Sequence, residues 1–317
     1  MGVTIITPAF NAGRYIVETV KSVLNGHEST DIEYIVLNDG STDDTLDKLK
    51  PYLDRLSVIS HSNIGEQATV CKGIALAKHD IVAVINADDP IYPDLIKIAE
   101  RILNNNPQLV AVYPDWHKID SHGNIIEKVE TCDFDYNLML EQYRCIPGPG
   151  AFFRKSALKG ELPRNPLYRY SGDFDLWLRL GLRGPMARIP MFLATWRHHE
   201  EGASQRNISP EMAYNRIAVM KNFFSRTDLP IFIREKKRQA LSAAYYHAGI
   251  LAFHNPSISG RRYLSWSFLY KFVWPARFLK SNQRNWCYII YIFGAPFTTL
   301  IYKLVCLMRN YRRKVYV

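Results

Sequence analysis

Short apolar runs alternate with amphipathic stretches along the first third of the chain. Each run is rich in β-branched residues and predicts a buried strand; the runs lie at 3–7, 33–37, 56–59, 80–85 and 109–113. Between them, apolar residues recur every three or four positions, which predicts helices. This alternation is typical of an α/β, Rossmann-like fold, in which a mostly parallel sheet carries flanking helices.

Three short segments follow these predicted strands directly, at 8–11, 38–41 and 86–89, and the second and third are polar. In open α/β sheets, ligands bind beyond the carboxyl ends of the strands. We therefore expect the three segments to line one crevice.

The rest of the chain lacks this alternation. Its middle part is rich in turns, such as IPGPG at 146–150, and contains a helical pattern that begins near Ser171. From about Ser209 onward the pattern is helical. We therefore divide the chain into one domain, made of two halves, and a C-terminal helical region: 1–215, with halves 1–113 and 114–215, and 216–317.

Asp88 and Asp89 follow the predicted strand at 80–85 and precede Pro90. Two adjacent carboxylates are unfavourable unless a cation or a positive partner compensates them. Oxygen ligands favour Mg²⁺ or Mn²⁺, either of which bridges well to a diphosphate. The structural alternative is a solvated turn, since aspartate is common in turns.

Two acidic segments are further candidates. Asp39, in LNDGST, could accept a hydrogen bond from a nucleobase N–H, or it could simply cap the next helix. Asp173 and Asp175 begin a helical pattern, where acidic residues are stabilising without any catalytic role. A general base must, however, be a carboxylate or histidine that faces the crevice, and this segment offers one.

The histidine pair His198–His199 precedes a Gly-Ala-Ser-Gln segment. Paired histidines are usually incidental on a surface. One of them could be a metal ligand if this segment folds back over Asp88 and Asp89. The chain has no Walker A loop, GxGxxG, GxSxG or HExxH motif, which argues against ATPases, Rossmann dehydrogenases, serine hydrolases and zincins.

Taken together and in order, six segments resemble the family 2 glycosyltransferases, which have the GT-A fold. The likeness covers about residues 2–205, and the order of the segments makes it specific. The segments are ITPAFNAGRYIVETVKSVL, EYIVLNDGSTDDT, NIGEQATVCKGIALAKHDIVAVINADDP, IPGPGAFFRKSAL, SGDFDLWLRL and TWRHHEEGAS.

The resemblance implies a role for each matching residue. Three residues would line the nucleobase pocket: Pro8, Ala9 and Phe10. Asp39 would bond the base, Asp88 would face the ribose or donor sugar, and Asp89 would be the direct metal ligand. Asp173 would be the general base, and His199, or alternatively His198, would be a late metal ligand.

Three positions depart from the family pattern. Gly172 stands where relatives commonly carry a glutamate directly before the base. Asn38 replaces a frequent aspartate, and Cys71 replaces a frequent asparagine. Neither of the last two changes removes a group that the chemistry requires, but both leave the donor open.

The resemblance implies an inverting transfer of a sugar from a nucleotide-sugar, most commonly a UDP-sugar, to a hydroxyl of a glycan or lipid-linked acceptor. Bacterial surface polysaccharide is the expected product. Two alternatives stay open: a nucleotidyltransferase of similar fold, and a protein that binds nucleotide-sugars without catalysis. The missing glutamate before Asp173 is the only support for the second alternative.

The net charge of +10 is unevenly distributed. Residues 236–317 contain 14 Lys or Arg and no Asp or Glu, whereas the whole chain has 40 basic and 30 acidic residues. Such a segment suits nucleic acid or an anionic membrane. No nucleic-acid recognition module accompanies the charge, so we favour the membrane.

The apolar content of the tail supports this interpretation. Residues 286–302 carry no charge, but Gly294 and Pro296 interrupt the run, and a spanning helix needs about 20 apolar residues. Residues 263–279 mix aromatic side chains with lysine and arginine, which suits the headgroup region. We therefore predict peripheral or monotopic attachment through 260–317. The alternative is that these helices pack on the first domain or on a second subunit of a homo-oligomer.

The five cysteines are scattered and never spaced as CxxC. This pattern argues against a disulfide framework and a zinc cluster, and it suits a reducing compartment. The N-terminus lacks the basic segment and long apolar stretch of a secretory signal. We expect a cytoplasmic protein attached to the inner face of the cell membrane.

Overall fold

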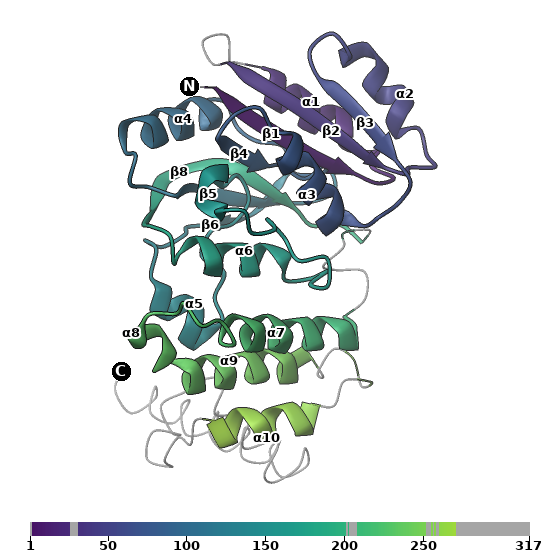
Figure 1. Ribbon diagram of the computed structural model, residues 1–317. Helices are drawn as coiled ribbons and strands as arrows, with labels where there is room; N and C mark the ends of the chain where they lie inside the picture. Colours follow the sequence, from purple (N-terminus) through teal and green to yellow (C-terminus); the bar gives the residue numbers. More distant parts are fainter. Residues whose placement is uncertain are drawn as a thin grey trace, which may run out of the picture. The chain divides into compact units, whose positions relative to one another are not determined.

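The computed structural model describes residues 2–25, 31–200, 202, 208–251, 255, 257 and 260–270. The chain divides into two compact units. The first consists of Met1–Met139 and Arg144–Asn207, and the second of Leu140–Tyr143 and Ile208–Val317. The first unit is α/β, and the described part of the second is helical (Figure 1).

An eight-stranded sheet forms the first unit. Its parallel part contains, in spatial order, β3 (Ser57–His61), β2 (Ile32–Asp39), β1 (Val3–Ala9) and β4 (Ile81–Val84). β7 (Phe152–Arg154) lies antiparallel between β4 and β5 (Ala111–Ile119). β5 also pairs with β6 (Ile125–Val129), antiparallel, and with β8 (Met186–Arg197), parallel.

Helices flank this sheet (Figure 1). They are α1 (Ile16–Leu24), α2 (Thr45–Leu49), α3 (Glu66–Leu76), α4 (Leu95–Asn105) and α6 (Gly172–Leu180), with short 3₁₀ turns η1 (Lys50–Tyr52) and η2 (Lys155–Leu158). α5 (Tyr136–Gln142) joins the two units in sequence. The prediction of a mostly parallel sheet with flanking helices is confirmed.

The parallel strands are uniformly apolar because both faces of the sheet are covered. All seven residues of β1 are buried, so its sequence shows no alternation of polar and apolar positions. α1 contributes a buried face that includes Ile16, Val20 and Val23. These side chains belong to the same core cluster as β1, α4 and Phe152 of β7.

Strand β8 was not predicted from the sequence, and Pro190 explains why. A proline lacks the backbone N–H that a central strand needs, and it is tolerated at bulges. Ile189 pairs with Pro114, and the next paired residue is Phe192 with Asp115. The pairing therefore skips Pro190 and Met191, and the proline lies in an irregularity of the ladder.

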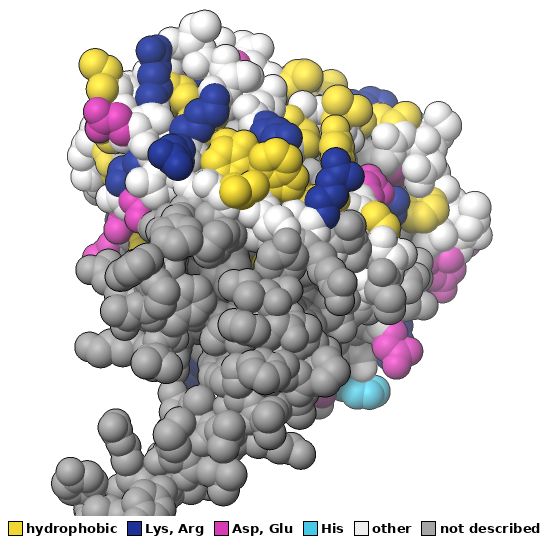
Figure 2. Space-filling model, turned by 90° about the horizontal axis from the view of Figure 1, so that it is seen from below, with side chains coloured by type: hydrophobic (Ala, Val, Ile, Leu, Met, Phe, Trp, Pro, Cys, Tyr) yellow, Lys and Arg dark blue, Asp and Glu magenta, His cyan; other side chains and the backbone are white. Residues whose placement is uncertain are grey.

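The second unit contains α7 (Pro210–Phe223), α8 (Ile231–Arg234), α9 (Lys237–Ile250) and α10 (Gly260–Tyr270). α9 packs against both α7 and α10 (Figure 1). Tyr245 of α9 stacks with Trp266 and Tyr270 of α10, with ring centroids 6.1 and 5.7 Å apart. Figure 2 shows a face on which hydrophobic side chains lie beside those of Lys and Arg.

No helix in the described part of the chain is long and apolar enough to cross a membrane. Most of the predicted membrane segment, from residue 271 onward, lies outside the described residues.

Gly73 of α3 is expected to be required for close packing on the sheet. A Cβ at this position would lie 2.6 Å from Ile6 Cγ2 and 2.8 Å from Leu37 Cδ1, both in fully buried side chains. Helix propensity alone predicts that Gly73→Ala raises the free energy of unfolding by about 1 kcal/mol. We expect the overpacking to dominate and to lower it by about 1–3 kcal/mol in urea unfolding.

Ala75→Gly is the matched control, since Ala75 is an exposed residue of the same helix. This substitution changes helix propensity at a site that does not pack on the sheet. It should therefore lower the free energy of unfolding by about 1 kcal/mol. A more stable Gly73→Ala protein would show that α3 does not press on the sheet as described.

Candidate active site

The segments at the carboxyl ends of β1, β2 and β4 lie at one edge of the sheet, because these strands are parallel neighbours in register. Hydrogen bonds join the first two segments: the N–H of Asn11 donates to Ser41 Oγ (3.0 Å), and the N–H of Thr42 donates to Asn11 Oδ1 (2.8 Å). The expected convergence of the strand ends is therefore present.

Three residues were expected at the nucleobase pocket. Pro8 and Ala9 are the last two residues of β1 and are buried, whereas Phe10 is half exposed, at 52%. Asp39 is buried at the end of β2. Its carboxylate accepts hydrogen bonds from the N–H groups of Ile64 (2.6 Å) and Gly65 (3.0 Å). Asp39 therefore holds the start of α3. The sequence had suggested that it could cap the next helix along the chain, which is α2.

Asp89 is buried and engaged by the protein through both carboxylate oxygens. Oδ1 accepts from the backbone N–H of Arg197 (2.7 Å), and Oδ2 accepts from Asn86 Nδ2 (2.9 Å). Burial raises the pKa of this carboxyl well above its usual value, and the charge of Asp88 adds to the effect. Asp89 therefore ties the end of β8 to the segment after β4.

Asp88 meets His199 instead. His199 Nε2 lies 2.9 Å from Asp88 Oδ2, and the two side chains are 8% and 31% exposed. The rings of Tyr15 and His199 pack edge to face, with centroids 4.9 Å apart. The backbone N–H of His198 donates to the carbonyl of Ile119, which continues the contact between β8 and β5.

The guanidinium of Arg197 holds this arrangement in place. Nε donates to the carbonyl of Asp88 (2.8 Å), Nη1 to the carbonyl of Asp120 (3.2 Å), and Nη2 to the carboxylate of Glu18 (2.7 Å). The side chain is only 1% exposed and lies over the ring of Tyr15, 4.8 Å from its centroid. Arg197 was not predicted to have a role. Its position directly after the mostly apolar run LATW could have indicated a buried, paired charge.

Two of the three expected metal ligands therefore meet, and the third, Asp89, faces protein donors. Within the described residues, no group of three or more His, Cys, Asp or Glu side chains could hold a metal ion. The carboxylate of Asp88 and the imidazole of His199 fit Mg²⁺ or Mn²⁺ as a partial ligand set. Mg²⁺ is commonly bound by one or two carboxylates together with substrate phosphates.

The structure distinguishes the two aspartates of α6. Asp175 is buried and accepts from Arg179 Nε (2.9 Å) and Nη2 (2.8 Å), so it stabilises the helix locally. Asp173 is exposed, and its carboxylate accepts from the N–H of Phe174 (2.7 Å). Of the two, only Asp173 is accessible to a substrate.

Glu66 and Arg164 lie close to these carboxylates and were not predicted. Arg164 Nη1 is 3.1 Å from Glu66 Oε1. Part of the Glu66 side chain reaches solvent, yet the surrounding protein raises its pKa through burial; the charges of Asp173 and Asp88 raise it further, and Arg164 opposes them. Arg164 thus holds Glu66 at the start of α3, next to Gln67, which lies against Gly172 at the start of α6.

A glutamine occupies the space beside Gly172. A Cβ on Gly172 would lie 2.2 Å from Gln67 Oε1, so a larger residue here requires Gln67 to move. Gln67 is itself held, because its Nε2 donates to the carbonyl of Arg169 (3.0 Å). Cys71, one turn further along α3, contacts the backbone of Arg164. The departures from the family pattern at 172 and 71 thus belong to one contact between α3 and the segment before α6.

Several known proteins are similar to this chain in sequence. Residues 4–161 match the family model described as glycosyl transferase family 2. The chain is 33% identical to the chondroitin synthase of Escherichia coli over 227 residues, which are 71% of this chain and 33% of that protein. It is 27% identical to an uncharacterized glycosyltransferase of Haemophilus influenzae, over 77% of this chain and 84% of the relative.

The fold is also that of solved structures. TarS of S. aureus in complex with UDP-GlcNAc superposes with a TM-score of 0.66 at 17% identity, over 85% of this chain and 81% of that one. The mannosyltransferase PcManGT of Pyrobaculum calidifontis, in complex with GDP-Man and Mn²⁺, gives 0.55 at 16% identity, over 91% and 85%.

The mostly parallel sheet, with polar segments beyond its strand ends, defines the first unit as a GT-A-like α/β domain. The first unit therefore carries a glycosyltransferase family 2 domain. The chain spans a third of the length of the chondroitin synthase that it matches.

The raised pKa of Asp89 predicts a pH-dependent stability. Its folded pKa lies above the unfolded value of 3.8, so between the two values the folded state binds more protons, and stability falls as pH rises through that window. Asp89→Asn should remove this contribution, which amounts to about 1.4 kcal/mol for each unit of pKa shift.

The measurement is the free energy of unfolding in urea from mildly acidic to neutral pH, with a chelator present. The exposed-site variant Asp54→Asn is the control and should keep the slope of the unmodified protein. Equal slopes for Asp89→Asn and the unmodified protein would mean that Asp89 is not protonated more readily in the folded state.

Proposed function

We propose that this glycosyltransferase moves a sugar from a nucleotide-sugar, a UDP-sugar in the first instance, to a hydroxyl of a glycan or lipid-linked acceptor, with inversion at the anomeric carbon. The observation that carries the proposal is the exposed carboxylate of Asp173 at the start of α6, on a GT-A-like domain in which Asp88, paired with His199, follows strand β4. We infer that Asp173 and the Asp88–His199 pair serve one reaction.

The relatives support the choice of substrates. One is named a chondroitin synthase and another a hyaluronan synthase, which favours polysaccharide biosynthesis. Structures of similar fold are titled as complexes with UDP-GlcNAc, with UDP and with GDP-Man. These names favour a nucleoside diphosphate as the leaving group.

In the proposed reaction, Asp173 removes the proton of the acceptor hydroxyl as its oxygen attacks the anomeric carbon. The new glycosidic bond forms as the bond to the diphosphate breaks on the opposite face of the sugar, which inverts the configuration. Asp88 and His199 would hold Mg²⁺ or Mn²⁺, which would supply positive charge to the departing diphosphate. Asp89 would keep Asp88 and Arg197 in place.

The nucleobase would bind at the ends of β1 and β2. Phe10 offers an exposed aromatic face there, and Asp39 lies at the adjacent strand end. Asp39 would accept from the base in addition to its bonds with Ile64 and Gly65, since each carboxylate oxygen has two acceptor sites. Pro8 and Ala9 would form the wall behind the base.

We assign catalysis to residues 1–215, with donor binding mainly in 1–113 and acceptor binding in 114–215. The helical region 216–317 would attach the protein to the inner face of the cytoplasmic membrane, with 260–317 against the anionic leaflet. The support is the concentration of positive charge and aromatic residues in this part of the chain. A homo-oligomer formed through the same helices is the competing assignment.

Asp173→Asn tests the function directly. A general base contributes about 10²–10⁴-fold, so we expect this variant to lose that factor in Mn²⁺-dependent hydrolysis of a UDP-sugar, in which water replaces the acceptor hydroxyl. Its melting temperature should fall by only a few degrees, because Asp173 is exposed and a charge in the first turn of a helix contributes about 0.3–1 kcal/mol.

Asp175→Asn is the neighbouring control, and it should lose stability through the Arg179 ion pair rather than turnover of the folded protein. A fully active Asp173→Asn together with an inactive but folded Asp175→Asn would reverse the assignment of the base. Absence of metal-dependent hydrolysis of any nucleotide-sugar would remove the proposed function altogether.

We further infer that Glu66 supplies, from α3, the carboxylate that relatives carry directly before the base. The Arg164 ion pair holds Glu66, and Gln67 fills the space that a glutamate at 172 would need. A hydrogen bond to a charged group is worth about 1.5–3 kcal/mol. Glu66→Gln should therefore lower the rate of donor hydrolysis by about 10–100-fold.

A glutamate introduced at position 172 should restore the rate of donor hydrolysis that Glu66→Gln loses. The triple variant Glu66→Gln, Gln67→Ala, Gly172→Glu makes room for this side chain and should recover most of the lost activity. Glu127→Gln, at an exposed site on β6, is the control and should be fully active. An unaffected Glu66→Gln, or an inactive but folded triple variant, would contradict the equivalence of the two positions.

A further inference from the structure

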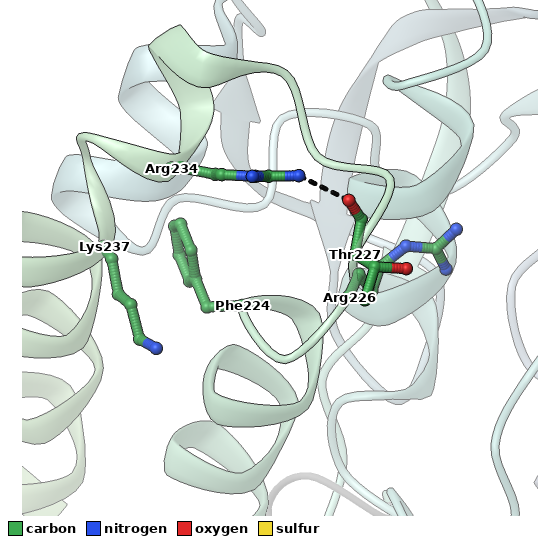
Figure 3. A pocket seen from close by; sticks show the side chains of 5 residues that line it. All are labelled: Phe224, Arg226, Thr227, Arg234 and Lys237. Atoms are coloured by element: carbon green, nitrogen blue, oxygen red, sulfur yellow. Dashed lines mark hydrogen bonds between the residues drawn. The ribbon is translucent and has the colours of Figure 1, made fainter.

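The second unit contains a hollow with basic walls. It has a volume of 480 Å³ and is lined by Phe224, Arg226, Thr227, Arg234 and Lys237 (Figure 3). Three of the five lining residues are cationic and none is acidic. Phe224 itself is buried, so its ring forms an apolar part of the wall.

Two of the cations are held in fixed positions. Arg234 donates to the backbone carbonyl of Thr227, as Figure 3 shows. Arg226 makes two hydrogen bonds to Asp228, from Nε to Oδ1 (2.9 Å) and from Nη2 to Oδ2 (2.7 Å). Lys237 is exposed and has no carboxylate partner among the residues that the structure describes. The hollow therefore keeps an excess of positive charge.

Helix α8, next to this hollow, presents two large apolar side chains to solvent. Ile231 is 75% exposed and Phe232 is 62% exposed, directly after Pro230. Ile233 of the same helix is buried at 2% and anchors the helix, whereas Ile231 and Phe232 face solvent. Exposed apolar groups of this kind mark interaction sites when they adjoin one another, rather than lying singly.

The combination points to one kind of partner. Cations attract phosphate groups, and large apolar side chains bordered by cations suit the boundary between lipid headgroups and acyl chains. A purely soluble anion would use the basic hollow, but it would give no reason for Ile231 and Phe232 to be exposed beside it. A purely apolar partner would gain nothing from the cations.

We propose that α8 and the adjoining hollow form a membrane-docking site, in which the hollow receives phosphate headgroups of an anionic bilayer while Ile231 and Phe232 enter its surface. This inference rests on the membrane attachment proposed above, and it locates an anchor outside residues 260–317. A basic residue near an anionic leaflet contributes about fivefold to binding.

The test is sedimentation of the full chain with vesicles of phosphatidylcholine, with or without phosphatidylglycerol. Arg234→Gln/Lys237→Gln should bind anionic vesicles about 25-fold more weakly, at fivefold for each cation. Ile231→Ser/Phe232→Ser should also bind them more weakly. Both pairs should hydrolyse a UDP-sugar at the unmodified rate, which separates failure of docking from failure of the proposed catalysis.

Matched controls lie in the first unit. Ile125→Ser/Ile126→Ser replaces two adjacent isoleucines that are 50% and 51% exposed, and Lys97→Gln/Arg101→Gln removes two exposed cations from α4. Both should bind vesicles as the unmodified protein does. Equal binding by the α8 variants and these controls would overturn the proposal.

Two further measurements distinguish docking through α8 from binding of soluble phosphate and from attachment through residues 260–317. If inorganic phosphate raises the melting temperature of the unmodified protein but not of Arg234→Gln/Lys237→Gln, while vesicle binding is unaffected by the substitutions, the hollow is a site for soluble phosphate and the proposal fails. If deletion of 260–317 abolishes vesicle binding while the α8 substitutions leave it intact, the anchor is the tail and the proposal also fails.

Discussion

The arrangement of the candidate site depends on the buried guanidinium of Arg197. A buried charge is costly unless it is paired and hydrogen-bonded. Here the carbonyls of Asp88 and Asp120, the carboxylate of Glu18 and the ring of Tyr15 surround it. These partners come from three separate parts of the chain, so one side chain joins α1, the segment after β4 and the end of β5. His199, two residues further on, is thereby brought to Asp88.

The sequence predicted the parallel half of the sheet because each of its strands is a short, uninterrupted apolar run. Strand β8 was missed for a local reason: Pro190 breaks the apolar pattern, and only the skipped pairing opposite Pro114 and Asp115 shows how a strand accommodates it. Local pattern cannot reveal such a bulge, since the partner strand lies about 75 residues away in sequence.

The acidic candidates were visible in the sequence because strand ends and helix starts mark where a site can form. The individual roles of these candidates could not be predicted from the sequence. Asp88 and Asp89 are adjacent in the chain but face different partners, and Asp173 and Asp175 of α6 also differ in their surroundings. Glu66 lies in the matching segment NIGEQATV, but nothing in that segment singles it out, and Arg164 lies in none of the matching segments. They meet only through the packing of α3 against the segment before α6, which is a property of the tertiary structure.

The contact between Gln67 and Gly172 also constrains how such sequences diverge. A side chain at 172 collides with the amide at 67, and a smaller residue at 67 leaves unfilled space while 172 is glycine. Each single substitution should therefore be destabilising on its own, whereas a double substitution that enlarges residue 172 and shrinks residue 67 would keep the contact filled. We expect the two positions to be energetically coupled, so that the residue tolerated at either one depends on the residue at the other.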